Sequence, residues 1–202
     1  KEGAFMAMTL AFIHTSPALV PLFTELAKRE LAELDRFHMV DESLLRNTIQ
    51  AGTLTRATTR RLAAMVGSAR EGGADAVLVT CSSIGPAATT AAGLFDFPVM
   101  RVDEAMAEQA VGVGRRIGVA ATLRTTLEPT VALLRDKAAD AGRDVEIVEA
   151  LAEGAFEAVM AGDVATHDRM LLDSLARLTA QVDVVVLAQA SMARVVSLLA
   201  AD

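Results

Sequence analysis

The sequence contains one cysteine, no tryptophan and no tyrosine, and its net charge is −7. A single cysteine excludes a disulfide within the chain and is typical of a reducing compartment, so we expect a cytoplasmic protein. The negative charge, together with the lack of a basic stripe and of indole or phenol rings, argues against nucleic acid as a partner. No apolar run reaches the roughly 20 residues that a membrane helix needs. The start, KEGAFMAM, lacks the basic, apolar and small-residue regions of a signal peptide.

The motifs that bind metals, phosphates and dinucleotides are missing as well. There is no pair of cysteines, no HExxH sequence and no tight cluster of His and Asp. The pair Gly112 and Gly114 does not extend into a GxGxxG fingerprint, because Ile117 stands where the third glycine would be. No P-loop sequence occurs either. We therefore expect neither a metal nor a cofactor.

Short apolar segments alternate with amphipathic ones along the chain, in which 52% of the residues are hydrophobic. The amphipathic segments predict helices, most clearly over 55–71, 127–141 and 167–180, and residues 41–54 are expected to form a polar connection. Strands that are apolar along their whole length and separated by helices are typical of a parallel sheet covered on both faces, so the predicted fold class is α/β. The predicted strands span residues 9–13, 34–40, 76–80, 98–102, 117–121, 145–148 and 182–187.

An internal repeat refines this architecture. The segment DAVLVTCSS, which starts at residue 75, reads closely against DVVVLAQAS, which starts at residue 183. In the same way, LAFIHT from residue 10 lies over IGVAAT from residue 117. The repeat predicts two similar α/β halves, residues 1–102 and 103–202, with parallel sheets and a pseudo-twofold axis between them.

A short polar segment, here called a corner, follows each of the repeated strands at its carboxyl end, where parallel sheets bind ligands. Hydroxyls and the backbone N–H groups of helix starts attract anions, so a small carboxylate is the expected ligand, and a cleft between the halves would collect the corners into one active site. Arg124 can pair with a carboxylate or lie in solvent, and His14 can contact the ligand or cap a turn. The corner residues are His14, Thr15 and Ser16; Cys81, Ser82 and Ser83; Thr122, Arg124 and Thr125; and Gln189, Ala190 and Ser191.

Cys81 is the residue with the most versatile chemistry in these corners. It follows a buried strand and precedes a predicted helix start at residues 84–86, a setting that lowers a thiol pKa below about 8.5 and suits a base, an acid or a nucleophile. The alternative is a small buried side chain without a chemical role. His38 and His167 are interpreted as an ordinary strand residue and a helix-surface residue.

The chain resembles the aspartate/glutamate/hydantoin racemase superfamily over nearly its whole length. The segments that carry the resemblance are DAVLVTCSS (75–83), DVVVLAQAS (183–191), GVAATLRTT (118–126), IHTSP (13–17) and LLRNTIQAG (44–52). The resemblance implies a cofactor-free active site between two α/β halves, in which one cysteine from each half faces the α-carbon of the substrate. It implies that Cys81 is the first of these cysteines and that its serine and threonine neighbours bind the substrate. These neighbours are Ser82 and Ser83, the Thr15–Ser16 and Thr122–Thr125 corners, and Asn47, which would face the ligand.

The sequence departs from this family pattern at Gln189, which stands at the position of the second cysteine. An amide has no usable proton near neutral pH, although it can donate a hydrogen bond. Three interpretations stay open: a racemase or epimerase with another second acid, a one-thiol decarboxylase or cis–trans isomerase, and a carboxylate-binding protein without catalysis. In the racemase, Cys81 is the acid and base of proton transfer at a carbon next to a carboxylate. In the one-thiol enzymes, it protonates an enediolate or adds to a double bond. A homo-oligomer is compatible with the sequence, and the family is expected to continue with a further strand and helix beyond the point where this chain ends.

Overall fold

The structure is a computed structural model that describes residues 8–199, so the expectations for the first residues and for the chain end lie outside the described part. The chain divides after Val102 into two compact units. Each unit has its own parallel sheet, and each is described by itself. No helix within residues 8–199 is long and apolar enough to cross a membrane.

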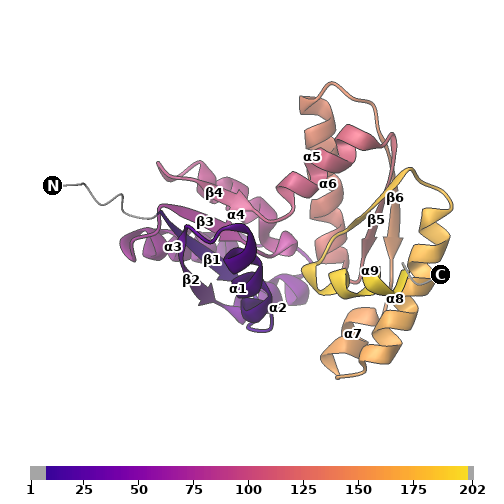
Figure 1. Ribbon diagram of the computed structural model, residues 1–202, viewed down its shortest axis with the longest axis horizontal. Helices are drawn as coiled ribbons and strands as arrows, with labels where there is room; N and C mark the ends of the chain where they lie inside the picture. Colours follow the sequence, from indigo (N-terminus) through magenta and orange to yellow (C-terminus); the bar gives the residue numbers. More distant parts are fainter. Residues whose placement is uncertain (1–7, 200–202) are drawn as a thin grey trace. The chain divides into compact units, whose positions relative to one another are not determined.

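The first unit contains a four-stranded parallel sheet in the order β2-β1-β3-β4. In this sheet Ile13 pairs with Met39 on one side and with Val79 on the other. The strands are β1 (Thr9–His14), β2 (Asp35–Val40), β3 (Ala76–Val79) and β4 (Val99–Arg101), and the helices are α1 (Leu19–Glu30), α2 (Glu42–Ala51), α3 (Arg56–Glu71), η1 (Ser82–Ile84) and α4 (Gly85–Ala92) (Figure 1).

The two faces of the first sheet bury different side chains because successive residues of a strand point to opposite faces. Ala11 and Ile13 of β1 belong to the core that includes Leu62 of α3 and Ala88 of α4. Phe12, between them in sequence, packs on the other face, with its ring 5.8 Å from that of Phe23 in α1. The end of β1 is therefore enclosed on both faces.

The second unit contains a three-stranded parallel sheet in the order β6-β5-β7. Helices α5 and α6 cover one face of this sheet and α8 covers the other (Figure 1). Gly118 of β5 permits the close approach of α8, because a Cβ atom there would lie 2.8 Å from Cγ of Leu178. The elements are α5 (Glu104–Val113), β5 (Arg116–Ala121), α6 (Arg124–Asp140), β6 (Glu146–Leu151), α7 (Ala155–Met160), α8 (Val164–Thr179), β7 (Val184–Leu187), η2 (Ala190–Val195) and α9 (Val196–Leu199).

The predicted fold class, α/β with parallel sheets, is confirmed. The order β2-β1-β3 in the first unit corresponds to β6-β5-β7 in the second, with the same parallel pairing, as the sequence repeat leads one to expect. The pseudo-twofold axis stays a prediction.

One predicted connection is wrong. Residues 41–54 contain helix α2, which begins after Asp41, whose side chain accepts a hydrogen bond from the Ser43 backbone N–H at 3.0 Å. Only Leu44 and Thr48 of this helix are buried. Six of its ten residues are polar, and this is why the sequence pattern indicated a polar connection.

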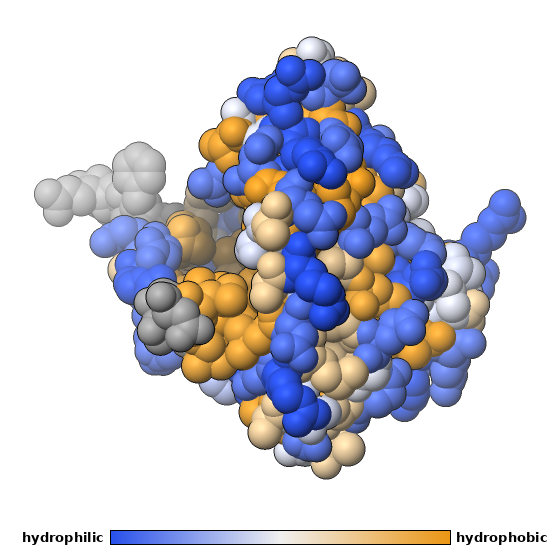
Figure 2. Space-filling model, turned by 90° about the vertical axis from the view of Figure 1, so that its right-hand side faces the viewer, coloured by the Kyte–Doolittle hydropathy of each residue, from blue (hydrophilic) through white to orange (hydrophobic). Residues whose placement is uncertain are grey.

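The outer surface carries hydrophobic residues in patches among hydrophilic ones on the face that Figure 2 presents. In the second unit the exposed large apolar side chains include Val113, Met160, Val196 and Leu199. They belong to α5, α7 and α9, so this exposed apolar surface comes from several separate helices.

Candidate functional site

The first corner lies where β1 and β3 end side by side. Because Ile13 pairs with Val79, the residues that follow these strands are brought to the same edge of the sheet. Cys81 is half-buried there, whereas Thr15, Ser82 and Ser83 are buried. The structure thus brings together the predicted residues of these two corners.

Burial raises the pKa of the Cys81 thiol. This effect outweighs hydrogen bonds that favour the thiolate, which come from the Thr15 side chain, the backbone N–H groups of Ser83 and Ile84, and the Ser83 side chain. The expectation of a lowered pKa is therefore wrong, because the desolvation of the strand end exceeds the stabilisation by these donors. The thiol of the isolated protein is protonated at neutral pH.

His14 is fully buried, and both of its ring nitrogens have protein partners. Its Nδ1 lies 2.8 Å from Oγ1 of Thr80, and its Nε2 lies 2.8 Å from Nδ1 of His38. The rings of His14 and His38 stack at 5.1 Å. The predicted contact of His14 with a ligand stays a prediction, and the geometry shows an imidazole that is engaged within the protein.

This hydrogen-bonded chain continues to both sides of the imidazole pair. Nε2 of His38 lies 3.0 Å from Oγ1 of Thr24, whose hydroxyl also donates to the carbonyl of Val20 at 2.7 Å. At the other end, the Thr80 hydroxyl donates to the carbonyl of Ile13 at 3.1 Å.

Burial is the main reason that the pKa of both histidines is lowered. For His14 the value falls to about 4, with a further contribution from His38, and for His38 the charge of Arg36 adds to the effect of burial. The pair is therefore neutral at pH 7. Sequence reasoning missed the link from His14 to His38 and Thr80, which only the pairing of three separate strands reveals.

The second corner lies where β5 and β7 end. Oε1 of Gln189 accepts two hydrogen bonds from Thr122, one from the backbone N–H at 2.7 Å and one from the hydroxyl at 2.9 Å. A backbone N–H can only donate, so the atom that meets it is the amide oxygen and not the amide nitrogen. The Gln189 side chain is therefore held with its oxygen towards β5.

Other donors of this corner lie in the first turn of α6. The helix begins at Arg124, three residues earlier than predicted, so Arg124 and Thr125 are helical rather than part of a loop. Arg124 is exposed. Within residues 8–199, Oγ1 of Thr125 is the buried side-chain polar atom that has no hydrogen-bond partner. A buried hydroxyl without a partner is unusual and is one of the features expected of a ligand-binding corner.

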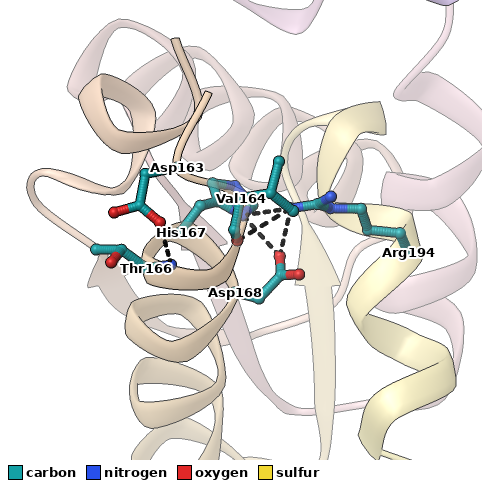
Figure 3. Close-up of polar contacts among 6 residues, drawn as sticks. All are labelled: Asp163, Val164, Thr166, His167, Asp168 and Arg194. Carbon is teal, nitrogen blue, oxygen red and sulfur yellow. Dashed lines mark hydrogen bonds and ion pairs between the residues drawn. The ribbon is translucent and has the colours of Figure 1, made fainter. Parts of the chain in front are cut away.

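An ion pair between Arg194 and Asp168 links η2, the segment that follows Gln189, to α8 (Figure 3). The Arg194 guanidinium lies 2.6 Å from Oδ1 of Asp168, and Nδ1 of His167 lies 2.9 Å from the same oxygen. His167 is buried, so its interpretation as a helix-surface residue is wrong: it faces η2 rather than solvent. The cluster restricts the polypeptide directly after Gln189.

The remaining predicted site residues are less enclosed. Asn47 is exposed on α2, Ser191 is exposed on η2, and Ala190 is partly buried. Oγ of Ser16 accepts a hydrogen bond from the backbone N–H of Ala18 at 3.3 Å. No side-chain hydrogen bond within residues 8–199 joins these four to Cys81 or Gln189, and their substrate-binding roles stay predictions.

No group of three or more His, Cys, Asp or Glu side chains within the described chain could hold a metal ion. A surface hollow exists at the opposite, amino-terminal end of the second sheet, lined by Arg115, Arg116, Asp144, Val145, Glu146 and Asp183.

A family model described as Asp/Glu/hydantoin racemase matches residues 12–202. Among solved structures, the chain is similar to an allantoin racemase from Klebsiella pneumoniae (16% identity, TM-score 0.65, covering 96% of this chain and 78% of that one). It is also similar to an aspartate racemase from Picrophilus torridus (11% identity, TM-score 0.65, covering 94% and 84%). At these identities the likeness establishes the fold alone. No curated protein matches the sequence.

Proposed function

Because the chain belongs to the Asp/Glu/hydantoin racemase family, we propose that it is a racemase-type enzyme that transfers a proton at a carbon next to a carboxylate. The substrate is a small molecule, no cofactor takes part, and Cys81 is the acid and base. The observation that carries this proposal is the Cys81 corner, where a thiol at the end of β3 is surrounded by the hydroxyl and N–H donors of Thr15, Ser83 and Ile84.

These donors suit the reaction because loss of a proton next to a carboxylate leaves an enediolate with negative charge on oxygen. Fixed N–H and O–H groups stabilise such a charge as it develops. In the proposal, Thr15, Ser82 and Ser83 have this role. The resting thiol is protonated, so proton removal needs the minor thiolate form, whereas proton delivery uses the major form.

A one-thiol decarboxylase is a second candidate, and the geometry of Gln189 favours it. The Gln189 oxygen is engaged by Thr122, and its amide group cannot exchange a proton near neutral pH. In this reaction the electron pair of the broken carbon–carboxylate bond stays on the substrate as an enediolate, and carbon dioxide leaves. The Cys81 thiol then gives its proton to one face of that carbon, and the thiolate recovers a proton from water.

The experiment is solvent deuterium exchange, followed by proton NMR with amino acids, hydantoins and substituted malonates in heavy water. C81S and C81A are compared with the wild type after circular dichroism has shown that they are folded. Exchange with inversion that both variants abolish supports the racemase. Release of carbon dioxide, or exchange at one face, supports the one-thiol enzyme. Turnover that survives in C81A, or carboxylate binding without any turnover, contradicts the role of Cys81 and favours a binding protein.

A further inference from the structure

Two side-chain links join the ends of β1 and β3, one directly after the other. His14 and Thr80 form the first link, with Nδ1 of the imidazole 2.8 Å from Oγ1 of Thr80. The next residue of each segment forms the second link, in which the Thr15 hydroxyl is hydrogen-bonded to the Cys81 sulfur. Both residues of the thiol contact therefore follow, across one peptide bond, a residue of the imidazole link.

The backbone does not join the two segments at the level of the thiol. The last backbone hydrogen bond between them within residues 8–199 runs from the N–H of Thr80 to the carbonyl of Ile13, at 3.0 Å. The Thr80 hydroxyl donates to the same carbonyl at 3.1 Å. Beyond this point side chains set the separation of the segments, and the link from His14 to Thr80 directly precedes the thiol contact.

The imidazole of His14 is a rigid partner for the Thr80 hydroxyl. It is fully buried, and the centre of its ring lies 6.0 Å from that of Phe12 and 5.5 Å from that of Phe23. Its Nε2 lies 2.8 Å from Nδ1 of His38. Rotation of the ring would therefore break the hydrogen bonds of both nitrogens, and each of these bonds keeps the other in place.

The imidazole link and the thiol lie on opposite faces of the first sheet. His14 packs with Phe12 and Phe23 on the face that α1 covers, whereas Cys81 packs against the core that includes α3 and α4. Any influence of His14 on the sulfur therefore passes through Thr80 and the backbone. Apolar side chains could fill the aromatic layer under α1 without the cost of burying polar groups, so packing alone does not account for the link.

We propose that His14 is a positioning residue of the Cys81 corner, which through Thr80 fixes the spacing of the two segments and so keeps the Thr15 hydroxyl on the thiol. The inference deepens the proposed function and rests on it only in taking Cys81 as the reacting group. Without the link the segments separate, the hydroxyl leaves the sulfur, and the thiolate loses one of its donors.

The imidazole pair itself does not titrate in the pH range in which the thiol ionises. Burial, and then the charge of Arg36 in β2, lower the pKa of His38, while Glu25 and Lys28 of α1 pair with each other at 2.7 Å. The hydroxyls that bond the pair do not titrate, and the pair stays neutral from pH 7 upwards. A change in the pH profile of the thiol therefore reports the thiol contact and not the charge of the imidazoles.

The test measures how fast iodoacetamide alkylates Cys81, the single cysteine of the chain, between pH 7 and 10. Below the pKa of the thiol, the rate follows the thiolate fraction, so a pKa that is higher by one unit lowers the rate about tenfold. T80V removes the hydroxyl of the link, and T80S keeps it. T53V, at an exposed threonine of the same unit, is the matched control.

Two substitutions of His14 separate the two hydrogen bonds of its ring. An asparagine amide lies near the place of Nδ1, so H14N keeps a partner for Thr80 and loses the bond to His38. A glutamine amide lies near the place of Nε2, so H14Q keeps the bond to His38 and loses the partner of Thr80. Both variants lose one buried hydrogen bond, so a purely structural role of His14 would affect the thiol equally in the two.

T80V and H14Q should react about tenfold more slowly than the wild type at pH 8, because the thiolate loses a hydrogen bond. T80S, H14N and T53V should react as the wild type does. T15V, which removes the hydroxyl from the thiol contact, should slow the reaction by the same factor, and T80V added to T15V should change nothing further.

The proposal is overturned if T80V reacts as fast as the wild type or faster, or if T80V slows the reaction as strongly in the T15V background as it does alone. Circular dichroism shows which variants are folded, and the threonine variants decide the test if a histidine variant does not fold. Since the reaction needs no substrate, a lack of turnover would overturn the proposed function and leave this result unchanged, so the two proposals fail separately.

Discussion

The buried imidazole pair makes the stability of the protein depend on pH in a window set by its histidines. His14 is the group to perturb, because it is fully buried and the pKa of its folded form is about 4, whereas its ordinary value is 6.5. The folded protein therefore binds a proton at His14 less readily than the unfolded chain. Stability from this group is complete above pH 6.5 and is lost as the pH falls towards 4.

The size of the effect follows from the two pKa values. One unit corresponds to about 1.36 kcal/mol, so the loss between pH 7.5 and 4.5 is about 2.5 kcal/mol in the free energy of unfolding. The lowered pKa of His38 acts in the same direction. The pKa of Asp41 is also lowered, although burial opposes its hydrogen bonds to Ser43 and Arg61, and stability from it is lost only at more acidic pH.

Urea denaturation of the wild type and of H14Q at several values between pH 7.5 and 4.5 measures this dependence. Glutamine offers a donor and an acceptor but does not titrate in this range. We expect H14Q to be less stable than the wild type at pH 7.5 and its pH dependence to be smaller by about 2.5 kcal/mol. H38Q should keep most of the dependence, because burial is the first cause of the shift at His14.

A wild type whose stability does not change between pH 7.5 and 4.5 would refute this reasoning. An H14Q variant with the same pH dependence as the wild type would refute it as well, because the proton would then be taken up elsewhere. If H14Q does not fold, H38Q and the wild type still test the window.

Three further predictions concern other parts of the structure. D168N should destabilise the protein by only about 1 kcal/mol, because the ion pair with Arg194 is partly exposed, and a thermal melt measures this. G118A should lower the free energy of unfolding, measured by urea denaturation, by about 1–3 kcal/mol, because the added Cβ would meet Leu178 in a packed face. An alanine at an open surface glycine would meet no such neighbour. The rate of alkylation of Cys81 by iodoacetamide should be low at pH 7 and should increase only at a pH above the ordinary pKa of a thiol. A fast reaction at pH 7 would contradict the raised pKa.

The α/β class and the positions of the strands could be predicted because buried parallel strands are continuous apolar runs. The predicted and observed strands differ by a few residues at their ends, as for β6, which runs from Glu146 to Leu151. Helix α2 could not be predicted in the same way, since six of its ten residues are polar.

The position of the two polar corners at the strand ends could be predicted from the sequence, whereas their hydrogen bonding and protonation could not. The corner residues follow from the strand ends, but the protonation of Cys81 depends on burial, which arises from the packing of several segments. The direction of the Gln189 amide depends on Thr122, which is distant in sequence and becomes its neighbour only because β5 pairs with β7. Contacts of this kind cannot be read from local patterns.

The imidazole pair has a consequence for the hydroxyl of Thr80, the residue before Cys81. A neutral pair carries two N–H groups, so the hydrogen-bonded chain from Thr24 through His38 and His14 to Thr80 is complete only when all its bonds point the same way. If the Thr24 hydroxyl donates to His38, it must give up its hydrogen bond to the carbonyl of Val20 in α1. If the Thr80 hydroxyl donates to His14 instead, it must give up its hydrogen bond to the carbonyl of Ile13 in β1. A substitution of Thr24 on α1 can therefore select the imidazole tautomers and reorient a hydroxyl at the far end of β3.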